Sequence, residues 1–468
     1  MPSRCLLAAG LFLASCQLVR AQGPATPPSA DPRFKVDLLL IVAHPDDDTL
    51  AGTYLAKIRL DQGRKVAVVF ATRGDAGGNQ VGAERASSLG LVREQEARAD
   101  LATLGIETVW FLGGRDTPTQ NPLVSLANWD HGHTLAEAVR IVRLTRPDVI
   151  LTWLPMPVVG ENHGDHQAAS ILATEAFDFA ADPTFFPSQV ARSVSTFEPR
   201  LENLQPWQPR KLYFMSDAAD TGFMEGHGPS YSIKEVSSSR KVPFWQIALE
   251  QLHAHRTQFA SQYDQLMAAD PGTRERLITA NPGGEGLIEP LRFVRGKSVV
   301  GGRATDDVFE GIARATGSAA EGPGDVAGGR LSQAAAKPPA AIELGSQWQY
   351  YRQFWRAHGL TDMPPMDAPA IGPFEPDQTV RVPIRVLNSS GGPIDVTLTA
   401  TLPAGWKEEG DRPAAVRLAS GGDYTFESQV RIGSKAPDGP ATLRFDAGAL
   451  GAVSVRVVVK AGGGGLPQ

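Results

Sequence analysis

Apolar runs and amphipathic stretches alternate along residues 34–315. The run from Leu38 to Ala43 predicts a buried strand, and Pro45 ends it because proline has no N–H to donate to a sheet. Similar patterns predict strands over 66–71, 108–112, 149–153 and 211–215 and helices over about 49–62, 84–104, 133–145 and 244–267. This alternation is typical of an α/β fold with a Rossmann-like, doubly wound, mostly parallel sheet.

The apolar spacing changes to every second residue near the C-terminus. Two sets at this spacing are Val380, Val382, Ile384, Val386 and Val453, Val455, Val457, Val459. Together with Gly and Pro turns they predict an all-β, Ig-like sandwich over 371–461. Residues 316–341 are rich in Ala, Gly and Pro and are expected to form a linker. An aromatic helix is expected over 342–365, and docking onto a neighbouring domain is favoured for it over a sugar-binding platform.

The first 21 residues have the pattern of a secretory signal peptide. A weakly positive start precedes a short apolar run, Leu6 to Ala14, and Ala21 ends a small-residue cleavage site. Cys16 follows Leu13 to Ser15 as in a lipoprotein signal, so a lipid anchor at Cys16 is the alternative. Both interpretations predict export to the periplasm or the extracellular space.

Composition excludes several classes of function. The net charge is −6 and no basic block occurs, which argues against binding to nucleic acid or an anionic membrane. No later run reaches the roughly 18 to 20 apolar residues of a transmembrane helix. Gly74, Gly77 and Gly78 lack the GxGxxG spacing, so a nicotinamide cofactor is not expected. The oligomeric state is not indicated.

The two cysteines, Cys5 and Cys16, both lie within the predicted signal. A chain cleaved after Ala21 then has no disulfide and no thiolate ligand. Any metal in it must be bound by histidines and carboxylates.

Two clusters of His and Asp follow predicted strands. His44 to Asp48 comes directly after the first strand, and His163 to His166 comes after the strand at 149–153. Because the carboxyl ends of parallel strands share one edge of a sheet, the clusters can converge. Catalytic zinc takes three protein ligands and leaves a fourth position for water, and His44, Asp47 and His166 could supply those three. Alternatively, the Asp run only caps the following helix.

The motifs His44 to Asp47 and His163 to His166 resemble the two signatures of the PIG-L/LmbE zinc-dependent de-N-acetylases, which remove acyl groups from N-acylated amino sugars. The resemblance covers about residues 34–315. Further segments similar to the family, in the same order along the chain, are 72–78, 93–94, 111–116 and 254–258. The residues at 402–406 and 436–439 resemble a NEW3-type Ig-like module found on carbohydrate-active enzymes.

The resemblance implies a role for each candidate residue. It implies Zn²⁺, or another divalent metal, on His44, Asp47 and His166. Asp46 is then the general base, His163 is expected to stabilise the oxyanion as a cation, and Asp165 orients a histidine. Three residues are expected to bind substrate or lie near the metal pocket: Arg93, Asp116 and His255. Helix surface charge and turn formation are the structural alternatives for these residues.

Three functional hypotheses follow. The first is an exported zinc amidase acting on the N-acetyl group of an N-acetylglucosamine-type sugar or glycan. The second keeps the chemistry but changes the amide to an acylated peptide or thiol conjugate. The third is a noncatalytic carbohydrate-binding surface protein. Asp48 stands where many family members have Glu. Glu161 and Asn162 replace an aromatic residue of some members, so the resemblance does not define the substrate pocket.

Overall fold

We describe the fold from a computed structural model of the chain. The structure describes residues 31–158, 163–192, 201–218, 220–280, 287–313, 340–366 and 370–460. The predicted signal peptide, Cys16, most of the predicted linker, Glu161 and Asn162 lie outside these residues.

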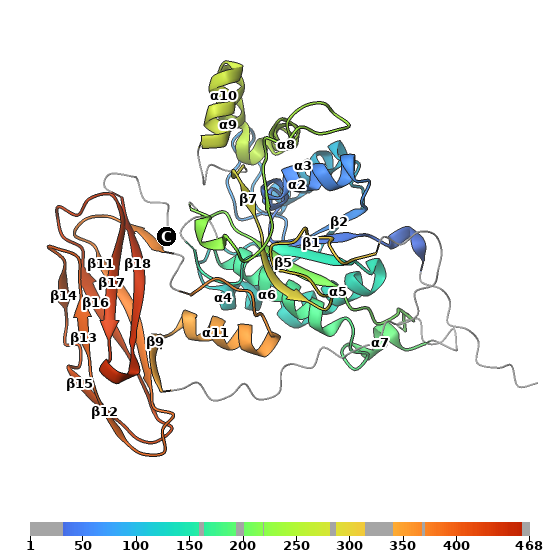
Figure 1. Ribbon diagram of the computed structural model, residues 1–468. Coiled ribbons are helices and arrows are strands. Elements are labelled where there is room, and N and C mark those ends of the chain that lie inside the picture. Colours follow the sequence, from blue (N-terminus) through green and yellow to red (C-terminus); the bar gives the residue numbers. More distant parts are fainter. Residues whose placement is uncertain are drawn as a thin grey trace, which may run out of the picture.

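A six-stranded sheet forms the centre of the N-terminal domain, in the order β3-β2-β1-β4-β5-β8 (Figure 1). The strands are β1 (Leu38–Val42), β2 (Val66–Phe70), β3 (Val109–Phe111), β4 (Val149–Trp153), β5 (Lys211–Met215) and β8 (Val294–Ser298). All neighbours pair in parallel except β5 and β8. β1 is fully buried, as its unbroken apolar run predicts. The predicted doubly wound sheet is confirmed, and the antiparallel edge strand β8 adds to the prediction.

Helices cover both faces of this sheet (Figure 1). One face carries α4 (Pro122–Asn128), α5 (His131–Thr145) and α6 (Gly164–Phe179), which pack against one another. The other carries α2 (Gly52–Ala56), α3 (Ser87–Thr103) and α8 (Phe244–Leu252), and α8 contacts both α2 and α3. Shorter peripheral elements are η1 (Pro32–Phe34), α7 (Pro187–Val190), η3 (Gly222–Met224), β6 (Ser230–Tyr231) and β7 (Leu291–Arg292). No helix among the described residues is long and apolar enough to cross a bilayer.

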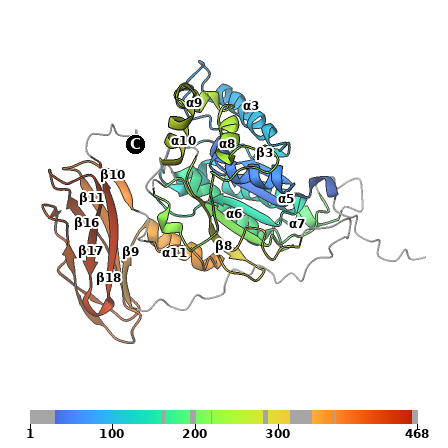
Figure 2. The ribbon, with the colours of Figure 1, turned by 45° about the horizontal axis from the view of Figure 1, so that its top comes forward.

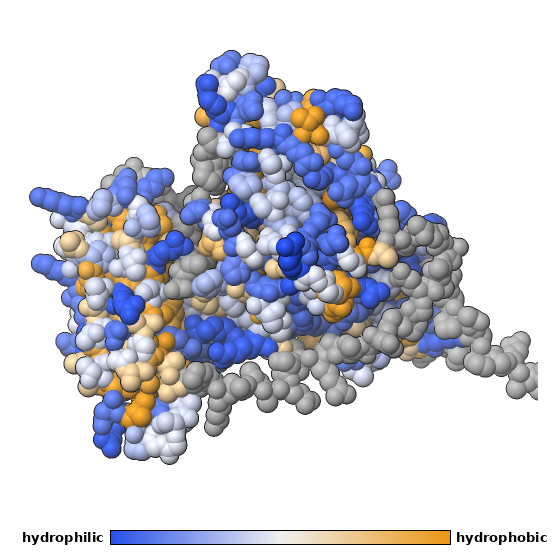
Figure 3. Space-filling view, viewed as in Figure 1, coloured by the Kyte–Doolittle hydropathy of each residue, from blue (hydrophilic) through white to orange (hydrophobic). Residues whose placement is uncertain are grey.

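Two predicted helices are interrupted. The helix expected over 49–62 is divided into α1 (Asp47–Leu50), α2 and the π-helical turn η2 (Lys57–Asp61). The helix expected over 244–267 is divided into α8 and α9 (Arg256–Ala268). Its break lies at His255, whose φ of −82° and ψ of 59° are not helical. α9 and α10 (Pro271–Ala280) form an arm whose visible surface is mainly hydrophilic (Figure 3).

The C-terminal domain is a β-sandwich with two four-stranded sheets, β10-β18-β17-β13 and β14-β16-β11-β9. Its strands are β9 (Ala341–Leu344), β10 (Ile371–Phe374), β11 (Thr379–Leu387), β12 (Ile394–Thr397), β13 (Thr399–Thr401), β14 (Lys407–Glu409), β15 (Ala415–Leu418), β16 (Asp423–Arg431), β17 (Gly439–Asp446) and β18 (Ala452–Val459), with the turn η4 (Gly448–Leu450). The predicted sandwich is confirmed. It begins earlier than expected, because β9 pairs with β11 although the predicted boundary was residue 371.

The aromatic helix α11 (Gln347–His358) lies between the two domains (Figure 1, Figure 2). Trp348 is buried in the sandwich core, whereas Tyr351 and Phe354 belong to the core of the α/β domain. The indole N–H of Trp355 donates to the carbonyl oxygen of Pro155 at 3.1 Å. His358 Nδ1 lies 2.8 Å from a carboxylate oxygen of Asp178 on α6. The helix therefore joins the domains by docking, as favoured from its sequence.

Replacing Trp348 with alanine is expected to lower the free energy of unfolding by about 3–5 kcal/mol, because it removes a large side chain from the sandwich core. Urea denaturation of the full chain measures the change. Tyr424→Ala is a control of the same kind on an exposed residue and should shift stability by no more than about 0.5 kcal/mol. Equal effects of the two substitutions would contradict the docking role of α11.

Candidate active site

The two His and Asp clusters meet at the carboxyl edge of the sheet, where β1 and β4 lie side by side. His44 follows β1, and His163 is the N-terminal cap of α6, after β4. β1 also pairs with β2, so this edge is the point at which the strand order reverses. Ligands bind at such points in open α/β sheets. The convergence expected from the sequence therefore occurs.

Asp47 joins the two clusters. Its Oδ2 atom accepts hydrogen bonds from the backbone N–H of Ala43 at 2.8 Å, the backbone N–H of His44 at 3.0 Å and the indole N–H of Trp153 at 2.7 Å. Its Oδ1 atom lies 3.5 Å from His44 Nδ1 and 3.1 Å from His166 Nε2. Burial opposes ionisation, but His166 and His44 hold the pKa of Asp47 well below its usual value. Three donors thus fix one oxygen and leave the other facing both histidines.

His44 is held from its opposite ring nitrogen by two carboxylates. Its Nε2 lies 3.3 Å from Asp116 Oδ1 and 3.4 Å from Asp165 Oδ2. Asp165 Oδ2 also accepts from the backbone N–H of Thr117 at 2.9 Å. Burial opposes the cation, but Asp116 and Asp165 raise the pKa of His44 well above its usual value. With Nε2 donating to these acids, Nδ1 is left directed toward Asp47.

His166 is enclosed by aromatic and imidazole rings. Its ring stacks on Trp153, with centroids 3.9 Å apart and an interplanar angle of 7°. The ring of His163 lies 4.3 Å away, centroid to centroid. Burial opposes the cation, but Asp47 raises the pKa of His166. The stacking fixes the direction in which Nε2 points.

His163 differs from its expected charge. Burial and the neighbouring His166 and His44 rings lower its pKa to about 2, so the free side chain is neutral rather than the expected cation. Its Nδ1 accepts from the backbone N–H of Asp165 at 3.3 Å, which leaves the ring proton on Nε2. A neutral imidazole in this state can still donate a hydrogen bond.

Asp46 lies beside this cluster in an unusual backbone conformation. Its φ is 125°, a region that non-glycine residues rarely adopt and that is associated with functional sites. Burial, together with the charge of Asp47, raises the pKa of Asp46 to about 7. Its Oδ2 atom accepts a hydrogen bond from the side-chain amide of Gln258. Asp46 is therefore a carboxylate that can take up a proton near neutral pH.

The three predicted substrate-binding residues make internal contacts. Arg93 donates to the carbonyl oxygens of Gly74 at 2.6 Å and Gly78 at 2.8 Å, and so shapes the glycine-rich loop. Asp116 faces His44 and accepts from the backbone N–H of Ala76 at 2.8 Å. Arg93 therefore holds the loop and Asp116 holds His44, and substrate binding by either residue stays a prediction.

Burial rules out the substrate contact expected of His255, but the residue does lie near the metal pocket, with its Nε2 4.0 Å from Asp48 Oδ1. The residue has 0% exposed surface, and its Nε2 lies 3.2 Å from Asp100 Oδ2. A side chain enclosed in this way cannot reach a substrate. Sequence reasoning missed Asp100 and gave no role to Gln258, although Gln258 ends the family-like segment at 254–258.

Two separations within the expected ligand set fit a tetrahedral metal ion. Ligand atoms about 2.1 Å from one ion at tetrahedral angles lie about 3.4 Å from each other. The separations of Asp47 Oδ1 from His44 Nδ1 and His166 Nε2, 3.5 and 3.1 Å, match this value. Ring nitrogens of His44, His163 and His166 also lie within 4.8 Å of one another. The residues therefore fit a metal, with His163 as a further neighbouring nitrogen.

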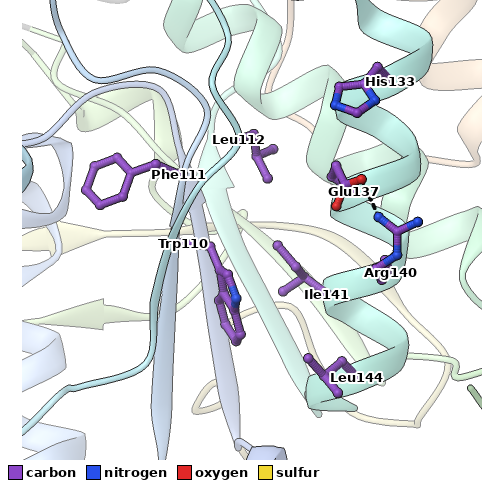
Figure 4. A pocket seen from close by; sticks show the side chains of 8 residues that line it. All are labelled: Trp110, Phe111, Leu112, His133, Glu137, Arg140, Ile141 and Leu144. Carbon is purple, nitrogen blue, oxygen red and sulfur yellow. Dashed lines mark hydrogen bonds and ion pairs between the residues drawn. The ribbon is translucent and has the colours of Figure 1, made fainter. Parts of the chain in front are cut away.

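A separate surface pocket of about 310 Å³ lies between β3 and α5 (Figure 4). Trp110 and Leu144 form part of its apolar lining, and Glu137 and Arg140 pair with each other on α5. Arg140 also pairs with Glu202, so its guanidinium is already engaged. None of the histidine and aspartate residues described above lines this pocket.

Comparison with known proteins agrees with the sequence resemblance. The family model described as "GlcNAc-PI de-N-acetylase" (PIG-L) matches residues 39–177. The model described as "NPCBM-associated, NEW3 domain of alpha-galactosidase" matches residues 374–449. Among solved structures, N,N'-diacetylchitobiose deacetylase from Pyrococcus horikoshii is similar, with a TM-score of 0.39 and 20% identity over 56% of this chain and 85% of that chain.

Two similar proteins are named 1D-myo-inositol 2-acetamido-2-deoxy-alpha-D-glucopyranoside deacetylase. The one from Geodermatophilus obscurus is 35% identical over 165 residues, which are 32% of this chain and 55% of that relative. The second deacetylase of this name from Frankia casuarinae is 30% identical over 267 residues, 50% of this chain and 83% of that relative. The chain therefore belongs to the PIG-L family of metal-dependent deacetylases and carries a NEW3 domain after its deacetylase domain.

Proposed function

We propose that the protein is an exported, zinc-dependent hydrolase that removes the N-acetyl group from an N-acetylglucosamine-type sugar or glycoconjugate. The observation that carries the proposal is the shared position of Asp47 Oδ1 between His44 Nδ1 and His166 Nε2, beside the carboxylate of Asp46. The names of the relatives, deacetylases of an acetamido sugar linked to inositol and of diacetylchitobiose, support the class of substrate.

The ligand set proposed for zinc is His44, Asp47 and His166. Bound there, zinc supplies a Lewis acid for the amide carbonyl and lowers the pKa of water. Asp165 and Asp116 keep Nε2 of His44 engaged, and Trp153 fixes both Asp47 and the ring of His166. These contacts limit the rotation of each ligand.

The proton transfers of amide hydrolysis are assigned to the carboxylate of Asp46, and stabilisation of the oxyanion is assigned to the imidazole of His163. Asp46 takes the proton of the attacking water, and its raised pKa lets it hold that proton and pass it to the leaving amine. His163 donates its Nε2 hydrogen to the oxyanion of the tetrahedral intermediate. The neutral state of His163 suits it as a hydrogen-bond donor rather than as a charged acid.

Export is proposed from the N-terminal pattern alone. Residues 1–21 have the charge, apolar run and small-residue site of a signal peptide, with Cys16 as the alternative lipidation site. Mass spectrometry of the N-terminus after expression distinguishes cleavage after Ala21 from lipid attachment at Cys16. A cytoplasmic chain that retains Met1 would contradict both.

Acetate release from a panel of N-acetylglucosamine-containing sugars tests the function. The zinc-loaded chain is compared with Asp46→Asn at equal zinc content. Release that is lost in the variant supports the proposed deacetylase and begins to define its sugar. If the zinc-loaded chain releases no acetate from any sugar but hydrolyses acylated peptides or thiol conjugates, the sugar assignment is wrong and the amidase class remains.

A further inference from the structure

We propose that Gln258 is a positioning residue that holds the carboxylate of Asp46, and that Glu96 and Asp100 of α3 hold Gln258 in place. The kinetic part of this inference rests on the proposed function, in which Asp46 is the general base. The structural part, a chain of contacts from α3 through α9 to Asp46, stands on the geometry alone.

The last contact of this chain is direct. The side-chain amide of Gln258 donates to Asp46 Oδ2. Because a carboxylate only accepts hydrogen bonds, the NH₂ group of the amide must face it. Asp46 has a φ of 125°, a conformation that persists only where its surroundings impose it. Gln258 is thus placed to restrain a side chain whose backbone is itself unusual.

Glu96 fixes the first turn of α9, which carries Gln258. Its Oε1 accepts from the backbone N–H of Thr257 at 2.9 Å, and its Oε2 accepts from the hydroxyl of Thr257 at 2.6 Å. The first N–H groups of a helix lack partners within the helix, so an acceptor from α3 takes the place of a local cap. Thr257 is 1% exposed, which protects both hydrogen bonds from water.

Asp100 holds the residue before α9. His255 Nε2 lies 3.2 Å from Asp100 Oδ2, and both side chains are fully buried. Glu96 and Asp100 are four residues apart on α3, so they share one face of that helix. This face contacts the chain where α8 ends and α9 begins. The break between the two helices therefore lets α3 set the direction of α9.

Gln80, two residues after the glycine-rich segment 72–78, adds a third restraint. The backbone N–H of Gln80 donates to the carbonyl oxygen of Thr257 at 3.0 Å, and its Oε1 accepts from the backbone N–H of Ser261 at 2.9 Å. Its side-chain amide donates to the carbonyl oxygen of Gln258. The backbone is thus held at Thr257 by α3 and at Thr257 and Gln258 by Gln80. These contacts restrict the position of Gln258 relative to Asp46.

A thermal double-mutant cycle tests the contact without any substrate. The full chain is compared with Gln258→Leu, Asp46→Ala and the double variant. A direct contact predicts that the Tm change of the double variant differs from the sum of the two single changes. The matched control is Gln265→Leu, an exposed glutamine of the same helix, which should be additive with Asp46→Ala. Additive behaviour of Gln258→Leu with Asp46→Ala overturns the proposal.

Kinetics of acetate release then separate positioning from substrate binding. Gln258→Leu is expected to lower kcat about 10²-fold with little change in KM, since misplacing a reacting group by about 1 Å has such an effect. Gln265→Leu should leave both constants unchanged. A raised KM at normal kcat for Gln258→Leu shows a substrate contact and overturns the proposal.

A pair of substitutions at Glu96 tests the role of α3. Glu96→Ala is expected to lower kcat, whereas Glu96→Gln keeps an oxygen acceptor for Thr257 and should retain most of it. Equal losses in the two variants contradict the role of this hydrogen bond. If the wild-type chain releases no acetate, the proposed function fails, while the thermal cycle still decides whether Gln258 holds Asp46.

Discussion

Replacing Asp46 with asparagine is expected to lower kcat for acetate release by about 10²–10⁴-fold while zinc stays bound. The amide has nearly the same size as the carboxylate and can still accept a hydrogen bond from Gln258, but it cannot take a proton from water. Asp46 is not one of the three proposed zinc ligands, so its replacement leaves the ligand set intact.

Zinc content per chain and the thermal midpoint are measured beside the rate. Both should match the wild type, which attributes the loss to the missing base. Asp395→Asn is a matched control, because Asp395 is an exposed residue of the sandwich that pairs with Arg417. It should leave kcat unchanged. A nearly normal rate in Asp46→Asn would show that another group accepts the proton.

The sequence predicted the part of the fold that depends on local pattern. The apolar run at Leu38 and the proline at Pro45 were enough to place β1 and its end. The residues just beyond a strand end must lie at the sheet edge, so His44 and Asp47 could be placed there as well. In this region the local sequence alone determines where the strand ends.

The sequence could not show contacts that depend on tertiary partners. His255 is polar and follows an amphipathic stretch, so nothing local reveals that Asp100, 155 residues earlier, draws it into the core. Arg93 was expected at the substrate from the family resemblance, and nothing local in its sequence shows that two backbone carbonyls of the glycine-rich loop accept hydrogen bonds from it. β9 was assigned to a linker and a helix. Its partner, β11, follows α11 in the sequence, so no local pattern shows this pairing.

The charge expected of His163 differs from that of its free side chain for a related reason. The motif suggested a cation because an oxyanion favours one. In the folded chain the ring is buried against two other imidazoles, and this surrounding lowers its pKa to about 2. Such pKa shifts depend on the distances between side chains of distant segments. These distances are known only once β1 and α6 are placed together in the fold.

Replacing Asp47 with alanine is expected to abolish both zinc binding and activity. Asp47 Oδ1 is the atom that His44 and His166 share, and without it the remaining nitrogens lack the carboxylate of the proposed ligand set. Removing a residue that only supports a ligand typically weakens metal affinity 10–100-fold, so loss of a ligand itself should exceed about 100-fold. Competition with a chelator of known zinc affinity measures the change.

Asp47→Ala also removes the acceptor of three buried N–H groups, those of Ala43, His44 and Trp153. Each unsatisfied donor costs about 1–3 kcal/mol, so a loss of stability accompanies the loss of zinc. Asp47→Asn separates the two effects, because its oxygen can replace Oδ2 as an acceptor while the negative charge is gone. Zinc affinity should fall in both variants and stability mainly in Asp47→Ala. Unchanged affinity in both would instead place the ion among the ring nitrogens of His44, His163 and His166, which lie within 4.8 Å of one another.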